Sequence, residues 1–151
     1  MIDEVSLKIL KILQQKARIP NVEVARQVGM APSAVLERIR KLEKQGFIDG
    51  YEVRLNPKRF AKSLVAFVSL KLKKLDAEIK VGQTLSKLPE VQEVHYVAGE
   101  DAFLVKIRAA DTEALSRLIR DKIAAIAGVQ STQTAIVLST YKETARIPID
   151  K

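Results

Sequence analysis

The sequence contains no cysteine and a single histidine, His95. Without cysteine the chain forms no disulfide, offers no thiolate ligand to a metal and has no thiol nucleophile. One imidazole beside Tyr96, with no second ligand, makes neither a metal site nor a nucleophile–base pair, so we interpret His95 as a half-exposed strand residue. We therefore expect no catalytic residue, no metal and no cofactor, and a protein that is not an enzyme.

The chain also lacks a run of about 18 apolar residues, and a basic N-terminal segment followed by an apolar one. The first absence predicts that no helix spans a membrane, and the second that no secretory signal is present. With the missing cysteine, these features predict a cytoplasmic protein with no membrane partner. The 151 residues, 47% hydrophobic and 29% charged, suit one ordinary globular domain or two small ones.

The formal net charge of +8 is distributed unevenly. Residues 1–60 carry 12 Lys/Arg against 7 Asp/Glu, a balance of +5, whereas residues 61–151 carry 14 against 11, a balance of +3. The positive charge is denser in the shorter N-terminal part. This distribution favours a polyanionic partner there.

Three short helices are predicted before residue 46. Apolar residues at helical spacing mark the first over residues 3–15. Asn21 is expected to cap a second helix that ends near residues 28–29, and Pro32 to stand in the first turn of a third that runs to Gln45. The three helices predict a compact trihelical module.

The second and third helices have the spacing of a helix-turn-helix. Ala25 is small where the helices would cross, Gly29 suits a left-handed turn, and Val35 returns an apolar side chain to the shared core. An ordinary helical hairpin is the alternative. A third helix with an apolar stripe of Val35, Ile39 and Leu42 and a basic opposite side favours a helix that lies in a DNA major groove.

The outer side of the third helix supplies the candidate DNA contacts. Near its N-terminus, side chains reach base edges, and we expect this of four residues: Ser33, Ala34, Glu37 and Lys41. Three more are expected to contact phosphates: Arg38, Arg40 and Lys44. A solvated face is the alternative for each lysine, and Glu37 would either accept from a cytosine amino group or pair with Arg40 or Lys41.

Residues 47–61 differ in character from the helices. Asp49-Gly50 predicts a tight turn, residues 51–55 alternate as an extended segment does, and Asn56-Pro57 ends it. We interpret this stretch as a wing or an extended linker. The expected division is a DNA-binding domain over 1–50, a linker over 51–61 and a second domain over 62–151.

The second domain reads strand, helix, strand, strand, helix, strand. The expected strands are 64–72, 91–98, 103–108 and 129–141, and the helices are 77–88 and 112–126. This order predicts an α+β domain with a four-stranded antiparallel sheet and both helices on one face. The apolar residues Val65, Phe67, Val105 and Ile136 indicate that both faces are apolar, so a second subunit is expected to cover the sheet.

The whole chain, over residues 2–149, resembles the Lrp/AsnC (feast/famine) family of transcriptional regulators. Each matching motif is modest, but their order and spacing together are specific: Ile2-Asp3-Glu4, Val28-Gly29-Met30-Ala31-Pro32-Ser33, Arg38-Ile39-Arg40-Lys41-Leu42-Glu43 with Gly46-Phe47-Ile48, Val97-Ala98-Gly99-Glu100, Gly128-Val129, Thr132, Thr134, and Lys142-Glu143-Thr144 before Ile147-Pro148. The resemblance implies a winged helix-turn-helix followed by a ferredoxin-like ligand-sensing domain. It also implies a sequence-specific regulator that binds double-stranded DNA as a homodimer, with dimers often assembling into octamers.

The resemblance further implies an amino acid effector, where one exists, bound between dimers near the loop joining the second and third strands. The matching positions are Gly99, Glu100, Asp101, Ala102, Thr132 and Thr134. Alanine stands at 102 where the family often has an acid, which predicts a weak or absent response to common amino acids. An architectural DNA-binding protein with little sequence preference and no effector is the alternative function.

Overall fold

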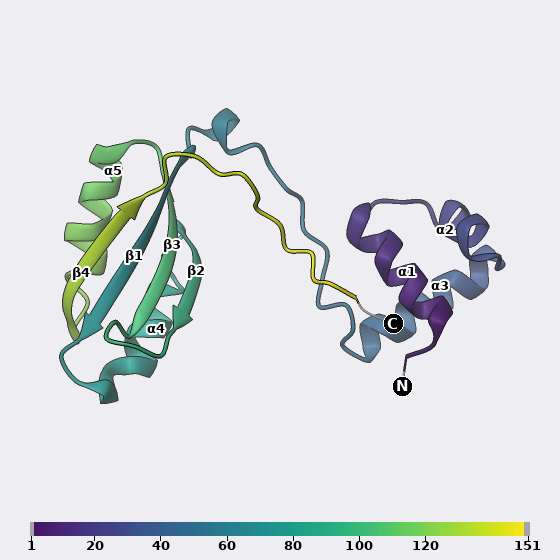
Figure 1. The fold of residues 1–151 in the computed structure, drawn as a ribbon, viewed down its shortest axis with the longest axis horizontal. Coiled ribbons are helices and arrows are strands. Elements are labelled where there is room, and N and C mark those ends of the chain that lie inside the picture. Colours follow the sequence, from purple (N-terminus) through teal and green to yellow (C-terminus); the bar gives the residue numbers. More distant parts are fainter. Residues whose placement is uncertain (1, 150–151) are drawn as a thin grey trace. The chain divides into compact units, whose positions relative to one another are not determined.

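The computed structural model describes residues 2–149, which form two compact units. The first consists of residues 2–54 and 143–149, and the second of residues 55–142 (Figure 1). The boundary between the units falls inside the expected linker, between residues 54 and 55. Residues 143–149, assigned above to the second domain, are grouped with the first unit, where residues 146 and 147 are hydrogen-bonded to α1.

The first unit contains three helices: α1 (Glu4–Gln15), α2 (Asn21–Val28) and α3 (Pro32–Lys44). Asp3 caps α1, accepting a hydrogen bond from the Ser6 N–H at 2.8 Å. The prediction that Asn21 caps α2 is wrong. Pro20 is the cap residue, because its extended backbone already aims its carbonyl at the N–H groups of the first turn.

The turn between α2 and α3 has the predicted geometry. Gly29 is left-handed at φ 69°, and Pro32 begins α3, where its missing N–H costs nothing. Ala25 is 2% exposed between the helices. Together the helices bury one apolar cluster: Ile9, Leu13, Val24, Ala25, Val35, Ile39 and Leu42.

The segment predicted as a wing or linker is an extended connection. Residues 48–56 belong to neither a helix nor a strand in the part of the chain that the structure describes. A short 3-10 helix, η1 (Pro57–Phe60), follows them. The prediction of an extended segment is therefore confirmed, whereas the tight turn predicted at Asp49-Gly50 does not form.

The second unit confirms the predicted α+β order. Its elements are β1 (Leu64–Leu72), η2 (Leu75–Ala77), α4 (Glu78–Leu85), β2 (Val91–Tyr96), β3 (Phe103–Ala109), α5 (Thr112–Arg117), the π-helical turn η3 (Leu118–Ile123) and β4 (Val129–Ile136). The sheet is antiparallel throughout, in the order β2-β3-β1-β4 (Figure 1). No helix among residues 2–149 is long and apolar enough to cross a membrane.

One face of the sheet packs on the helices, and the other is open within the chain. Val68 pairs with Val105, and both are fully buried with residues of α4 and α5. Ile136 pairs with Ala66, so Val105 and Ile136 both lie on the helix-covered face. Because side chains alternate along a strand, Val65 and Phe67 lie on the open face. The four residues that predicted two apolar faces are therefore divided equally: two lie on the helix-covered face and two on the open face.

Candidate nucleic-acid interface and ligand loop

Helix α3 is oriented as its periodicity predicts. Val35, Ile39 and Leu42 are buried against α1 and α2. The opposite side of the helix is exposed and carries five of the candidate DNA-contacting residues: Ser33, Glu37, Arg40, Lys41 and Lys44. Ala34, at the border of this side, is half-buried. Six of the seven predicted DNA-contacting residues are thus at or beside one accessible surface.

Arg38, the seventh candidate, has partners inside the protein. Its guanidinium donates to Asp3 Oδ2 at 2.5 Å and to Ser6 Oγ at 3.1 Å. The bond from Arg38, with the Ser6 N–H, lowers the pKa of Asp3 to about 2. Arg38 therefore joins the middle of α3 to the first turn of α1, a role different from the phosphate contact predicted for it.

The remaining basic side chains of α3 have no such partner among the described residues. The side chains of Arg40, Lys41 and Lys44 make no hydrogen bond or ion pair with another of residues 2–149, and neither does that of Glu37. Of the two alternatives for Glu37, pairing with Arg40 or Lys41 is thus not seen. On α2, by contrast, Arg26 is held 2.6 Å from Glu23, and the bonds from Arg26 and Gln27 lower the pKa of Glu23 to about 2.

The end of α3 is held by a residue that the sequence did not single out. The Tyr51 hydroxyl donates to Glu43 Oε1 at 2.9 Å across the turn at Gly46, whose φ is 73°. Burial and this bond raise the pKa of Tyr51 to about 12. The contact fixes where the chain leaves α3. No periodicity connects a residue beyond a turn with one on the helix before it, so no sequence signal was available.

The predicted ligand loop closes the hairpin between β2 and β3. Gly99 has φ 146°, a conformation favourable for glycine. The Ala102 N–H donates to the Leu70 carbonyl at 2.8 Å, and the Ala102 side chain is 8% exposed in the core of the second unit. Glu100 is exposed, with its carboxylate 3.4 Å from Lys71 Nζ. The loop thus presents one exposed acidic group beside one basic group.

Strand β1 lies between this loop and the strand β4 that carries Thr132 and Thr134. Leu70 of β1 pairs with Phe103 at the end of the loop and with Thr132 of β4, so two strand spacings, about 10 Å, separate Phe103 from Thr132. Within one chain the structure therefore does not bring the six predicted effector residues into one site.

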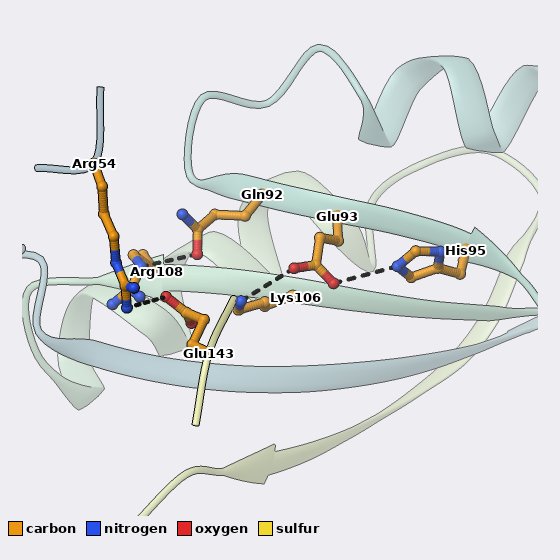
Figure 2. A network of polar contacts seen from close by, with 7 residues as sticks. All are labelled: Arg54, Gln92, Glu93, His95, Lys106, Arg108 and Glu143. Atoms are coloured by element: carbon orange, nitrogen blue, oxygen red, sulfur yellow. Dashed lines mark hydrogen bonds and ion pairs between the residues drawn. The ribbon is translucent and has the colours of Figure 1, made fainter. Parts of the chain in front are cut away.

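The open face of the sheet carries a polar network. Lys106 Nζ lies 3.0 Å from Glu93 Oε1, His95 Nε2 lies 3.3 Å from Glu93 Oε2, and Arg108 donates to Gln92 at 2.8 Å (Figure 2). The bond from Lys106 lowers the pKa of Glu93. His95 is exposed on its strand, as interpreted above. Residues 2–149 contain no cluster of three or more metal-ligating side chains.

Two family models match this chain. One, described as a winged helix-turn-helix DNA-binding domain, matches residues 2–49, and the other, described as the Lrp/AsnC ligand binding domain, matches residues 65–147. The chain belongs to the Lrp/AsnC family. The resemblance stated from the sequence is thereby confirmed, and so is the fold class.

Similar proteins of known name or structure agree with this assignment. The chain is 37% identical over 150 residues to the leucine-responsive regulatory proteins of Klebsiella pneumoniae and Escherichia coli, covering 98% of this chain and 92% of each of those proteins. The structure of AsnC from Escherichia coli superposes with a TM-score of 0.90 at 29% identity, over 98% of this chain and 99% of that one. A Neisseria meningitidis transcriptional regulator, solved as its L-Met complex, superposes with a TM-score of 0.93 at 32% identity, over 98% and 97% of the two chains.

These matches decide between the two functions considered above. An Lrp/AsnC chain with a DNA-binding helix-turn-helix and a ligand binding domain is a DNA-binding transcriptional regulator. The comparisons favour this function over an architectural protein without an effector.

Proposed function

We propose that α3 lies in the DNA major groove and reads sequence through its exposed side. Ser33, Ala34, Glu37 and Lys41 face base edges, while Arg40 and Lys44 contact phosphates. The observation that supports this is the combination of burial on one side of α3 with uncommitted cations on the other. Glu37, which has no internal partner among the described residues, is placed to accept from a cytosine amino group.

Competition between operator and random DNA at one fixed salt concentration tests this assignment. A specific regulator prefers its operator by about 10³-fold or more. Lys41→Ala is expected to reduce that preference by about tenfold, since one good base contact contributes roughly 1–3 kcal/mol of discrimination. Lys80→Ala, an equal loss of charge on α4, is the control. Unchanged preference in Lys41→Ala would remove this residue from base recognition.

The second unit is proposed to bind a small effector between copies of the chain. The Gly99 turn and the exposed Glu100 can receive the carboxylate and ammonium of an amino acid, the class of ligand in the Neisseria meningitidis complex. Asp101 and Ala102 complete the loop. Since Thr132 and Thr134 are a strand away within one chain, we place them in the site from a neighbouring copy.

Ala102 is expected to weaken the response to common amino acids, because methyl replaces the acid frequent at this position. Calorimetry with a panel of amino acids is expected to show dissociation constants weaker than about 1 mM. Tight binding of any of them would contradict the reasoning about Ala102. For any ligand detected, Glu100→Gln is expected to weaken binding and Glu78→Gln, a control on α4, to leave it unchanged.

The chain is proposed to form a homodimer through the open sheet face, and dimers to assemble further, to an octamer. Phe67, 36% exposed on that face, supplies its most exposed aromatic surface. Light scattering at micromolar concentration is expected to show at least a dimer. Phe67→Asp is expected to shift the mass toward monomer, whereas Ile136→Asp on the opposite face is the control. A wild-type monomer would overturn the proposal.

A regulator that acts on chromosomal DNA is expected in the cytoplasm of a cell without a nucleus. Fractionation of cells that produce the chain from its own gene tests this location. Recovery of the protein outside the cytoplasmic fraction would contradict it.

A further inference from the structure

The C-terminal segment 143–149, hereafter the strap, is bound to the rest of the first unit, residues 2–54, hereafter the reader unit. The side-chain amide of Gln14 on α1 donates from Nε2 to the Ile147 carbonyl at 3.0 Å. The same amide accepts from the Ile147 N–H at 2.9 Å through Oε1. Both polar groups of one backbone residue are thus satisfied by one side chain, as they are in a hydrogen-bonded pair of an antiparallel ladder.

A second contact joins the strap to the end of α1. The Arg146 guanidinium donates to the Gln15 carbonyl at 3.3 Å. Gln15 is the last residue of α1, so its carbonyl has no partner within the helix, and a cation is electrostatically favoured at this end. The Thr144 hydroxyl accepts from the Arg146 N–H at 3.1 Å and shapes the strap locally.

A third contact joins the strap to the other chain segment that leaves the reader unit. Arg54 lies 3.9 Å from Glu143, an ion pair drawn in Figure 2. These two segments, which continue into residues 55 and 142, are the covalent connections between the first and second units. The ligand-domain family model extends to residue 147, yet residues 143–147 are grouped with the reader.

The strap also lies between α1 and β4 in the chain of connections. Residues 137–142 separate it from β4, the strand that carries Thr132 and Thr134. With the strap docked, hydrogen bonds join α1 to the chain segment that leaves β4. With the strap released, residues 2–54 remain joined to the second unit covalently through residue 55. The contacts that Gln14 and Arg146 make are solvent-exposed, which is the character of contacts that open locally without global unfolding.

We propose that residues 143–149 form a releasable strap, docked through Gln14 and Arg146, that tethers α1 to the chain segment leaving β4 and thereby strengthens DNA binding. The role in DNA binding rests on the proposed function of α3. Docking itself does not, because it depends on contacts within the first unit. The strap makes no DNA contact in this proposal, so its effect is greatest where two reader units must engage one DNA together.

Amide hydrogen exchange on the full chain tests docking. Gln14→Ala removes both bonds to Ile147, and Gln15→Ala is the matched control, since only its backbone carbonyl is used. Exchange at the Ile147 N–H is expected to accelerate about tenfold or more in Gln14→Ala and to stay unchanged in Gln15→Ala. Arg146→Ala is expected to act in the same direction, and Arg146→Lys, which keeps a donor for Gln15, to restore protection. Equal exchange in wild type and Gln14→Ala would overturn docking.

DNA affinity measured on the same variants tests the consequence. Gln14→Ala is expected to weaken binding to an operator with two half-sites by roughly five- to tenfold, and to a single half-site by less than about twofold, because a looser tether lowers the effective concentration of the second reader unit only when two must bind together. Unchanged operator affinity with lost protection would overturn the role of the strap in DNA binding. If wild type binds no DNA, the proposed function of α3 fails with that role, while the exchange result still decides docking.

Discussion

Two arginines two residues apart on α3 are predicted to behave in opposite ways. Arg40 is exposed and has no hydrogen bond or ion pair with another of residues 2–149, whereas Arg38 is bound to Asp3 and Ser6. Arg40→Ala is therefore expected to remove a phosphate contact and leave the melting temperature unchanged. Arg38→Ala is expected to lower the melting temperature and leave the number of phosphate contacts unchanged.

The size of the Arg40 effect follows from counterion release. Each phosphate contact contributes about 0.9 to the slope of log affinity against log salt, so two reader units lose about 1.8. Over a fourfold rise in salt, from about 50 to 200 mM, this amounts to about a tenfold smaller loss of affinity for Arg40→Ala than for wild type. Fluorescence anisotropy with labelled operator over this salt range measures it. A smaller slope in Arg38→Ala with an unchanged slope in Arg40→Ala would refute the assignment.

Three further predictions concern stability and titration. Gly128→Ala is expected to destabilise the second unit by about 3 kcal/mol in denaturant unfolding, through backbone strain and overpacking. The φ of Gly128 is 103°, and an added Cβ would lie 2.8 Å from the Cβ of Ala77. Gly50→Ala is the control and is expected to be near neutral, because an added Cβ there meets no atom within 4 Å. The pKa of Asp3 is lowered from 3.8 to about 2, so its contribution to stability is complete above pH 3.8 and lost as pH falls toward 2; circular-dichroism melting against pH is expected to show this loss, and an unchanged melting temperature down to pH 2 would contradict it. Ultraviolet titration is expected to show a tyrosinate component near pH 12 that disappears in Tyr51→Phe.

The elements that could be predicted are those governed by a repeating local pattern. The buried stripe of α3 follows from helical spacing, and β1 begins and ends at the expected residues because its whole length is apolar on one face. Gly29 was predictable because a left-handed residue at a helix end favours glycine. The C-terminal strand was predicted too long: apolar character continues past Ile136, but the ladder ends near there.

The contacts that could not be predicted join residues distant in sequence through long polar side chains. Helical arithmetic places Arg38 at the border of the exposed side, where a phosphate and Asp3, 35 residues earlier, are equally compatible partners. The strap has no periodicity, and its docking depends on one amide of Gln14 whose partner lies 133 residues away. Apolar cores are therefore predictable from residue patterns, whereas polar contacts between distant segments are not.

These polar links matter most in the reader unit because its core is small. Among residues 2–149, its apolar cluster holds seven buried residues against fourteen in the second unit. A unit of about 60 residues buries only about 60% of its unfolded surface and is marginally stable alone. The link from Asp3 to Arg38 therefore contributes to the relative position of α1 and α3, and not only to local charge balance.

Asp3→Asn separates this positioning role from simple electrostatics. Removing a negative charge from a protein that binds a polyanion strengthens binding if charge alone governs affinity. If Asp3 positions α3 through Arg38, the same change weakens operator binding and lowers the melting temperature. Glu4→Gln is the matched control, since it removes an equal charge from the next residue, whose side chain makes no hydrogen bond or ion pair among the described residues. Tighter DNA binding in both variants would show that the link between α1 and α3 does not position α3, because loss of the Asp3 charge would then have the same effect on affinity as loss of the Glu4 charge.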